Sequence, residues 1–323
     1  MSANLRALRR RILTPGISAT SLDVRGFHKK SPAAQELLET VGRHFLEGYG
    51  HAVEVRSTAE LEDRLERLPT RFRGFAYEGA AMGATVLDAL PGSRGNRLAG
   101  LLAGRGRDHV YMAYVGIGWA MARLPRPLWP DLSRTDPLIR WLVLDGYGFH
   151  QAYFKTERYV HGQYEDPRFA WSWGSPSYAR RAVDQGIGRA LWFVAGTEPD
   201  LAATLIEKFP EGRRADLFSG TGLAAAYACG AEEGELAQLA RRAGPYLRQL
   251  QQGAAFAAEA REKAGLTVAA TEVAVGALCG ISPAEAAALC RATRPSGPAA
   301  PDGSGYEKWR QDIAAAFVSR EEK

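Results

Sequence analysis

A short glycine-containing motif that recurs along the chain constrains the fold more than any other feature of the sequence. Each copy opens an apolar segment, and the first glycines of successive copies are 37, 30, 40, 34 and 33 residues apart. Periods of about 34 to 40 residues are typical of arrays of helix pairs. The copies begin at Gly79, Gly116, Gly146, Gly186, Gly220 and Gly253.

Helix-start signals fall between these copies. Ser57-Thr-Ala-Glu60 and Ser282-Pro-Ala-Glu285 have the form of capping boxes, and Thr197-Glu-Pro-Asp200 is a similar start. The only weak strand candidates are Ala52–Arg56 and Trp141–Leu144, and the second is better interpreted as helical. We therefore predict an all-α fold, an array of helix-pair repeats of the α-solenoid, TPR- or HEAT-like kind, which can curve around a cleft.

The Gly-x-Gly form of several copies has two interpretations. A phosphate-binding loop needs a strand before it and a helix after it, and no copy has a convincing preceding strand. Small residues four apart instead let two helix backbones approach closely, at some cost in helix propensity. Gly118 with Ala122, Gly148 with Ala152 and Gly222 with Ala226 fit that spacing, so close helix packing is favoured.

The motif copies extend through most of the chain and suggest a single repeat domain over residues 1–293, with a possible division near residue 130. Residues 294–305 are rich in Gly, Ser and Pro and are predicted to be a flexible linker. A C-terminal helix is predicted within residues 306–323.

Charge and cysteine content exclude some classes of protein. The net charge of +5, from 41 Lys and Arg against 36 Asp and Glu, is spread along the chain, whereas nucleic-acid binders usually show a dense basic stripe. We therefore expect no nucleic-acid partner. Cys229, Cys279 and Cys290 form no CxxC pair or metal-ligand spacing, which favours buried, reduced thiols in a cytoplasmic protein.

Membrane signals are weak. The basic start of the chain is not followed by the apolar run of a signal peptide, and the longest uncharged stretches, Val110–Ala122 and Phe218–Ala231, are too short to span a bilayer. Residues 4–13 can form a short basic amphipathic helix. For residues 1–15, peripheral membrane contact, a solvated arm and a partner-docking helix all remain open.

His150 interrupts a column of small residues. The fourth residue after each first glycine is Gly or Ala in the other copies, but in the third copy it is this histidine. Its side chain can project between helices as a general acid or base, because an unperturbed imidazole titrates near neutrality. The alternative is a hydrogen-bonded core histidine. His161 is three helical turns away, too far to share a metal ion, so no metal site is predicted.

Further candidates lie in similar apolar surroundings. Tyr153, Phe193 and Tyr227 occupy equivalent positions in three copies, and form either core packing or the lining of a channel for an apolar, unsaturated ligand. Glu78, Arg189 and Asp216 are charged residues in apolar segments. Buried charges need partners, so they form either structural ion pairs, such as Arg189 with Asp216 or Glu78, or a polar cluster in a cleft.

The sequence contains no nucleophile elbow, Walker motif, zinc signature or dinucleotide-binding fingerprint in the required context. No cofactor is predicted, and whether the protein is an enzyme stays open. The candidate catalytic residues are Glu78, His150, Tyr153, Arg189 and Asp216.

The ordered set of motif segments resembles the UNBL-type family of uncharacterised bacterial proteins, which accompany the enediyne polyketide synthase in gene cassettes. The segments are Gly74–Met82, Gly116–Arg123, Gly146–Phe154, Gly186–Phe193 and Gly220–Tyr227, and the resemblance covers roughly residues 5 to 290. It implies a role in enediyne antibiotic biosynthesis, in which the protein acts on or handles a polyketide-derived polyene. It supplies no catalytic residues.

Two functions from different classes remain. In the first, the protein is a biosynthetic protein that binds an apolar polyene in an aromatic-lined cleft. In the second, it is a non-catalytic scaffold whose concave surface binds the polyketide synthase or another pathway protein.

Overall fold

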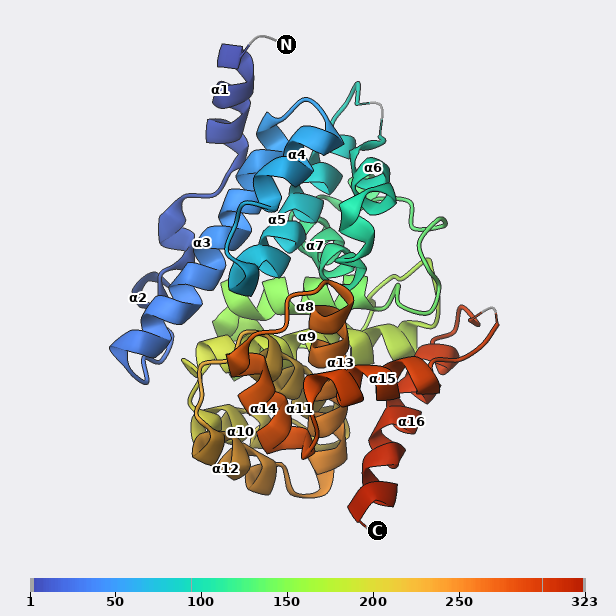
Figure 1. The fold of residues 1–323 in the computed structure, drawn as a ribbon. Helices are drawn as coiled ribbons and strands as arrows, with labels where there is room; N and C mark the ends of the chain where they lie inside the picture. Colours follow the sequence, from blue (N-terminus) through green and yellow to red (C-terminus); the bar gives the residue numbers. More distant parts are fainter. Residues whose placement is uncertain (1–2, 94, 298, 322–323) are drawn as a thin grey trace.

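Every regular element in the computed structural model is a helix within the described residues, 3–93, 95–297 and 299–321 (Figure 1). The prediction of an all-α protein is confirmed for this part of the chain. The weak strand candidate at residues 52–56 is wrong, because Ala52 belongs to a helix that continues to Glu54. Predictions for residues 1–15 and 306–323 fall partly on residues 1, 2, 322 and 323, which lie outside the described residues.

The longer helices form one row, in which each helix packs against the next. In order along the row they are α3 (Pro32–Glu54), α5 (Thr70–Asp88), α7 (Val110–Arg123), α8 (Leu142–Phe154), α9 (Pro176–Val194), α11 (Glu211–Tyr227), α13 (Leu247–Lys263) and α15 (Pro283–Thr293).

Shorter helices form a second layer at the two ends of this row. At one end are α4 (Thr58–Leu65) and α6 (Arg97–Ala103), and at the other are α10 (Pro199–Glu207), α12 (Glu233–Ala243) and α14 (Ala269–Cys279). In the middle, α7, α8 and α9 are joined by irregular segments that contain only the short turns η3 (Arg126–Leu128) and η4 (Glu157–His161). Helix pairs therefore repeat at both ends of the array but not at its centre.

The two glycines of a motif face opposite neighbours in the row. Gly146 on α8 lies against the carbonyl oxygen of Val115 on α7, whereas Gly148 lies against the carbonyl oxygen of Val183 on α9. A β-carbon on either glycine would lie 2.0 or 2.1 Å from that oxygen, so no larger residue fits without separating the helices. The prediction of close helix packing is confirmed, with the difference that in the Gly-x-Gly copies the two glycines, two residues apart, lie against the neighbouring backbones.

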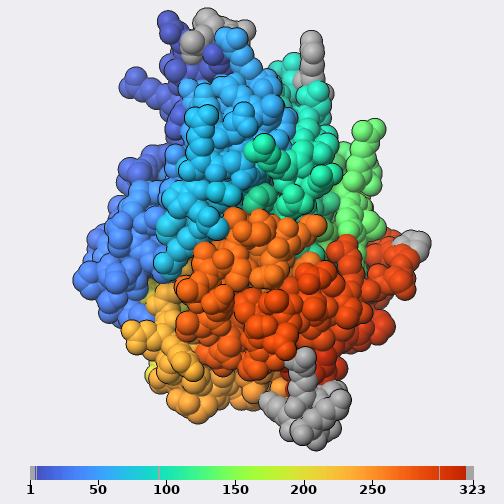
Figure 2. All heavy atoms as spheres, in the orientation of Figure 1, coloured from blue at the N-terminus to red at the C-terminus, as the bar shows by residue number. Residues whose placement is uncertain are grey.

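The row curls so that distant helices meet. From α13, Arg261 donates a hydrogen bond to the carbonyl oxygen of Arg71 at the start of α5 (3.2 Å), and Tyr111 on α7 donates one to Glu259 (3.3 Å). The orange segment that follows α13 lies directly against the light-blue α4–α5 region in Figure 2. Curling gives the row an inner face that is shielded from solvent.

The inner face consists of the side chains one residue before and three residues after each first glycine. Most of them are buried, and the residue before the glycine is polar in every copy except that of Val115. The pairs are Glu78 and Met82, Val115 and Trp119, Asp145 and Phe149, Gln185 and Arg189, Ser219 and Leu223, and Gln252 and Phe256.

The two ends of the chain cover different parts of this row. The N-terminal segment contains α1 (Ala3–Leu13), η1 (Ile17–Thr20) and α2 (Leu22–Arg25) and runs along α3, and His28 then donates a hydrogen bond to the carbonyl oxygen of Val194 on α9 (3.0 Å). At the other end, α16 (Ser304–Glu321) packs against α13 and α15. The termini lie at opposite ends of the molecule (Figure 1). The division into a domain, a linker and a C-terminal helix stays a prediction.

The three cysteines are buried and unpaired, as predicted. Among the described residues no single helix is both long and apolar enough to cross a membrane, although the bent pair α14 and α15 together meets that criterion of length and composition.

Candidate functional site

An apolar cavity lies between the N-terminal half of the inner face and the segment that covers it. Its walls come from α3, α5, α7, α8 and α9. Aromatic and aliphatic side chains dominate the lining, which includes Phe45, Phe75, Met82, Trp119, Phe149, Tyr153, Phe154 and Phe193. The cavity volume is about 60 Å³, so the space is narrow. Apolar walls with a few polar groups are typical of small-molecule sites.

Residues 14–21, which we call the N-terminal strap, form the cover of this cavity. Pro15, Ala19 and Thr20 all contribute to its lining. The strap approaches α3 closely at Gly42, where a β-carbon would lie 2.6 Å from the Thr20 side chain. Glycine at this position therefore lets the strap lie on α3 and close the cavity.

Glu78 projects into the cavity from the inner face of α5, and only 3% of the residue is exposed. Burial raises the pKa of its carboxyl to about 7, because the surroundings disfavour the charged form. Attraction to Arg189 lowers the pKa and repulsion from Asp145 raises it, and both effects are smaller than that of burial. At neutral pH this carboxyl is therefore divided between its protonated and ionised forms, as a general acid or base requires.

Arg189 forms a buried ion pair with Asp145 on the neighbouring helix α8. This corrects the prediction that its partner is Asp216 or Glu78. Burial lowers the pKa of the guanidinium, but attraction to Asp145 and Glu78 outweighs burial and raises it overall. Burial raises the pKa of Asp145 and exceeds the opposing effect of Arg189. The pair lies beside Glu78 and fixes a positive charge at the inner end of the cavity.

His150 and Tyr153 also line the cavity, from α8. Burial lowers the pKa of His150 to about 3, and repulsion from Arg123 lowers it further. The imidazole is therefore neutral at physiological pH. Burial raises the pKa of the Tyr153 hydroxyl well above its usual value. The His150 ring lies edge-on to Trp119, with the ring centroids 5.3 Å apart. Of the aromatic column, Tyr153 and Phe193 line this cavity, whereas Tyr227 does not.

Buried polar atoms without a hydrogen-bond partner surround the cavity. They include Nδ1 of His150 and Nε of Arg189, both from residues that line it. Such atoms are rare in native proteins because each costs free energy. Unsatisfied groups that surround a cavity are suited to bind a polar atom of a ligand.

A second, smaller cavity lies on the other side of Arg189. Its volume is about 30 Å³, and Tyr111, Asp145, Tyr227 and Glu259 are among its lining residues. Arg189 lines both cavities, so the Arg189–Asp145 pair separates them.

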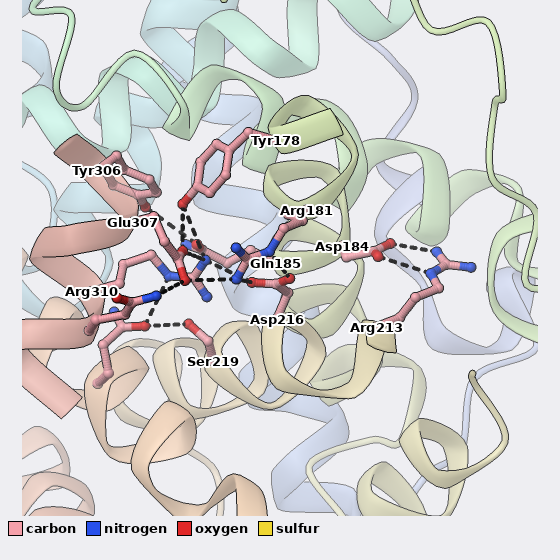
Figure 3. Close-up of polar contacts among 12 residues, drawn as sticks. Tyr178, Arg181, Asp184, Gln185, Arg213, Asp216, Ser219, Tyr306, Glu307 and Arg310 are labelled. Atoms are coloured by element: carbon pink, nitrogen blue, oxygen red, sulfur yellow. Dashed lines mark hydrogen bonds and ion pairs between the residues drawn. The ribbon is translucent and has the colours of Figure 1, made fainter. Parts of the chain in front are cut away.

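Asp216 lies elsewhere, in a network between the C-terminal half of the row and α16 (Figure 3). It accepts hydrogen bonds from Arg181 (2.9 Å) and Arg310 (2.7 Å). Glu307 on α16 accepts hydrogen bonds from Arg181 and from the hydroxyl of Tyr178, both at 2.9 Å. The structure therefore brings Glu78, His150, Tyr153 and Arg189 together and separates Asp216 from them.

Asp145 is the main site residue that sequence reasoning missed. Its signal lies in the column before each first glycine, which also contains Glu78 and is mostly polar. Sequence reasoning also missed Trp119 and the strap. A tryptophan in an apolar helix resembles an ordinary core residue, and the strap resembles an ordinary loop. Among the described residues no group of three or more His, Cys, Asp or Glu is arranged to hold a metal ion.

A curled row of glycine-spaced helices around an apolar cavity places the protein among all-α repeat proteins with an internal cavity. The chain belongs to the family described as proteins of unknown function, DUF1702, whose model matches residues 4–317. That description names no activity. No curated protein and no solved structure matches the chain.

Proposed function

We propose that the protein binds an elongated, apolar, unsaturated small molecule in the cavity beneath the strap, and that Glu78 exchanges a proton with it. The observation that carries this proposal is a carboxyl with a pKa of about 7, without an ion pair, facing an aromatic cavity. In a site that excludes water, such a carboxyl is an effective proton donor or acceptor.

The resemblance to proteins of enediyne cassettes suggests the ligand and the pathway. A polyketide-derived polyene is long, apolar and conjugated, and conjugated chains stack favourably on aromatic rings. We therefore propose a role in enediyne biosynthesis, with the polyene as the ligand. The cavity as it stands is too narrow for such a chain, so the strap and the lining side chains must move apart on binding.

The test combines ligand identification with one conservative variant. The protein is purified from a strain that carries the polyketide synthase, and the bound small molecules are extracted and identified by mass spectrometry. Glu78→Gln keeps the size of the side chain and removes the proton. We expect a bound polyene in both proteins and at least a tenfold loss of pathway product with Glu78→Gln.

Glu157→Gln is the matched control, because this exposed residue at η4 does not line the cavity. It should leave product titre unchanged. An empty cavity together with normal titre for folded Glu78→Gln would overturn the proposal. An empty protein that co-purifies with a stoichiometric protein partner, such as the synthase, would support the scaffold function instead.

A further inference from the structure

The end of the molecule formed by α1, α4 and α6 carries an unusual combination of exposed apolar and basic groups. Leu8, Ile12 and Ile17 are 49%, 70% and 65% exposed. Four of the seven exposed large hydrophobic residues of the described chain lie between residues 8 and 24. In Figure 2 α1, in dark blue, projects at the edge of the molecule.

The orientation of α1 explains why these residues are exposed. Arg9 donates a hydrogen bond to the carbonyl oxygen of Val53 (2.5 Å), and Arg10 pairs with Glu54 (2.7 Å). The helix therefore uses arginines to attach to α3 and turns Leu8 and Ile12 away from the protein. An ordinary surface helix buries its apolar side and exposes its charges. Leu13 alone of the named apolar residues of α1 packs against the core, so the exposed Leu8 and Ile12 are suited to a partner that accepts apolar side chains.

Basic residues gather at the same end of the molecule, and some of them are paired, such as Arg10 with Glu54 and Arg97 with Asp88. No acidic residue precedes Asp23 in the sequence. Burial lowers the pKa of Arg9, and repulsion from Arg97 and Arg6 lowers it further, which shows that basic groups converge here. Arg11 is exposed on α1.

A polar groove adjoins this basic cluster. It lies between the ends of α3 and α5 and the starts of α4 and α6, and its volume is about 620 Å³. Arg56 and Arg97 line it together with the hydroxyl groups of Ser57, Thr58 and Ser93. Arginines and hydroxyls bind phosphate well, and this volume is sufficient for a phospholipid headgroup.

We infer that this end of the protein docks on an anionic phospholipid bilayer. Leu8, Ile12 and Ile17 enter the boundary between headgroups and acyl chains, and the groove at Arg56 and Arg97 holds a headgroup phosphate. Apolar insertion together with electrostatic attraction is the usual basis of peripheral membrane binding. The inference goes beyond the proposed function and does not depend on the identity of the cavity ligand.

Docking would also place the strap, which covers the cavity, near the bilayer. Ile17 belongs to the strap, and its neighbours Pro15, Ala19 and Thr20 line the cavity. Insertion of Ile17 would therefore pull on the cover of the cavity, so that an apolar ligand can pass between the membrane and the protein without crossing water.

Vesicle flotation of the full chain tests this inference. We expect the protein to float with vesicles of equal parts phosphatidylglycerol and phosphatidylcholine at low salt, and at least tenfold less protein to float with pure phosphatidylcholine. The triple variant Leu8→Ser, Ile12→Ser, Ile17→Ser should lose at least tenfold of the bound fraction. The pair Arg11→Gln, Arg56→Gln should lose several-fold, as should raising the salt concentration, because salt screens exposed charges.

Val273→Ser is the matched control, since this residue is 45% exposed on α14, away from the basic end. It should float as the unaltered protein does. Circular dichroism confirms that each variant is folded. The inference is overturned if the unaltered protein stays unbound, or if the triple variant floats equally well. Loss of a co-purifying protein from the triple variant, without any vesicle binding, would assign the surface to a protein partner.

Discussion

The two halves of the inner face are built from the same repeat but are filled in different ways. In the C-terminal half, α16 packs on the inner face and the charged groups there are paired: Asp216 with Arg181 and Arg310, and Glu307 with Arg181 and Tyr178. In the N-terminal half the strap leaves a cavity, and Glu78 faces it without an ion pair. Pairing stabilises the first region, whereas the second keeps polar groups available for a ligand.

The largest effect is expected from Asp216→Ala in the paired half. Removal of this carboxylate leaves the buried guanidinium of Arg310 and its neighbour Arg181 with Glu307 as their one remaining acidic partner among the described residues. Breaking a buried ion pair from one side typically costs about 3–5 kcal/mol. Urea denaturation measures the change in the free energy of unfolding. Asp312→Ala, in an exposed pair with Lys308, should cost under about 1 kcal/mol. Equal losses of unfolding free energy for Asp216→Ala and Asp312→Ala would contradict the expected difference between buried and exposed ion pairs.

Titration of Glu78 should cost the protein about 3 kcal/mol of unfolding free energy between low pH and pH 8, and Glu78→Gln should abolish this loss. The folded-state pKa of about 7 lies above the ordinary glutamate value of 4.5, and one pKa unit corresponds to about 1.4 kcal/mol. The folded protein therefore holds the proton more tightly, and this contribution is full below pH 4.5 and lost as the pH rises through 7. Denaturation at pH 5 and pH 8 should show that Glu78→Gln removes this loss.

Glu307→Gln provides the opposite case in the other half. Burial raises the pKa of Glu307, but attraction to Arg310 and Arg181 outweighs burial, so the pKa is lowered overall. Its contribution to stability is therefore present above the unfolded pKa and is lost as the pH falls. The variant should lose stability at pH 8 and much less at low pH. If the effects of Glu78→Gln and Glu307→Gln on stability changed in the same direction with pH, the contrast between the two halves would be contradicted.

Glycine substitutions test the close packing of helix backbones, which the two halves share. A β-carbon on Gly186 would lie 1.9 Å from the carbonyl oxygen of Asp145, and one on Gly253 would lie 1.8 Å from that of Ser219. We expect Gly186→Ala and Gly253→Ala each to destabilise the protein by about 1–3 kcal/mol, because the helices must separate. Gly276→Ala on α14 meets open space and should instead stabilise it by about 0.5–1 kcal/mol. Thermal denaturation compares all three.

The smallest effect is expected from His150→Phe. The imidazole is neutral and its Nδ1 has no hydrogen-bond partner, so an apolar ring of similar size should change the unfolding free energy by less than about 1 kcal/mol. Tyr178→Phe, in the paired half, removes a hydrogen bond to the charged Glu307 and should cost about 1.5–3 kcal/mol. A larger loss for His150→Phe would show that this half is also held by polar contacts.

The sequence predicted the helices and their close packing, because glycine spacing and capping residues are local signals. It also predicted that Glu78, Arg189 and Asp216 are buried charges, but it assigned Arg189 the wrong partner. Whether Arg189 meets Asp145 or Asp216 depends on which side of α9 faces which neighbour and how far the row curls. These are properties of the assembled array, so no spacing within one helix reveals them. The burial of Arg310 depends on contacts between residues more than 90 positions apart along the chain, such as Arg310 with Asp216.

The glycine contacts have a consequence for the order of folding. Each helix of the row touches the helices next to it in the sequence, so most of the row can form through local contacts, which generally speed folding. α16 follows the row in the chain and pairs with Arg181 and Asp216, which were synthesised long before. On the ribosome, the C-terminal half of the inner face therefore stays open until α16 emerges, although Arg181 and Asp216 can already pair with each other. A pause in synthesis before residue 304 would present that open inner face to other molecules in the cell.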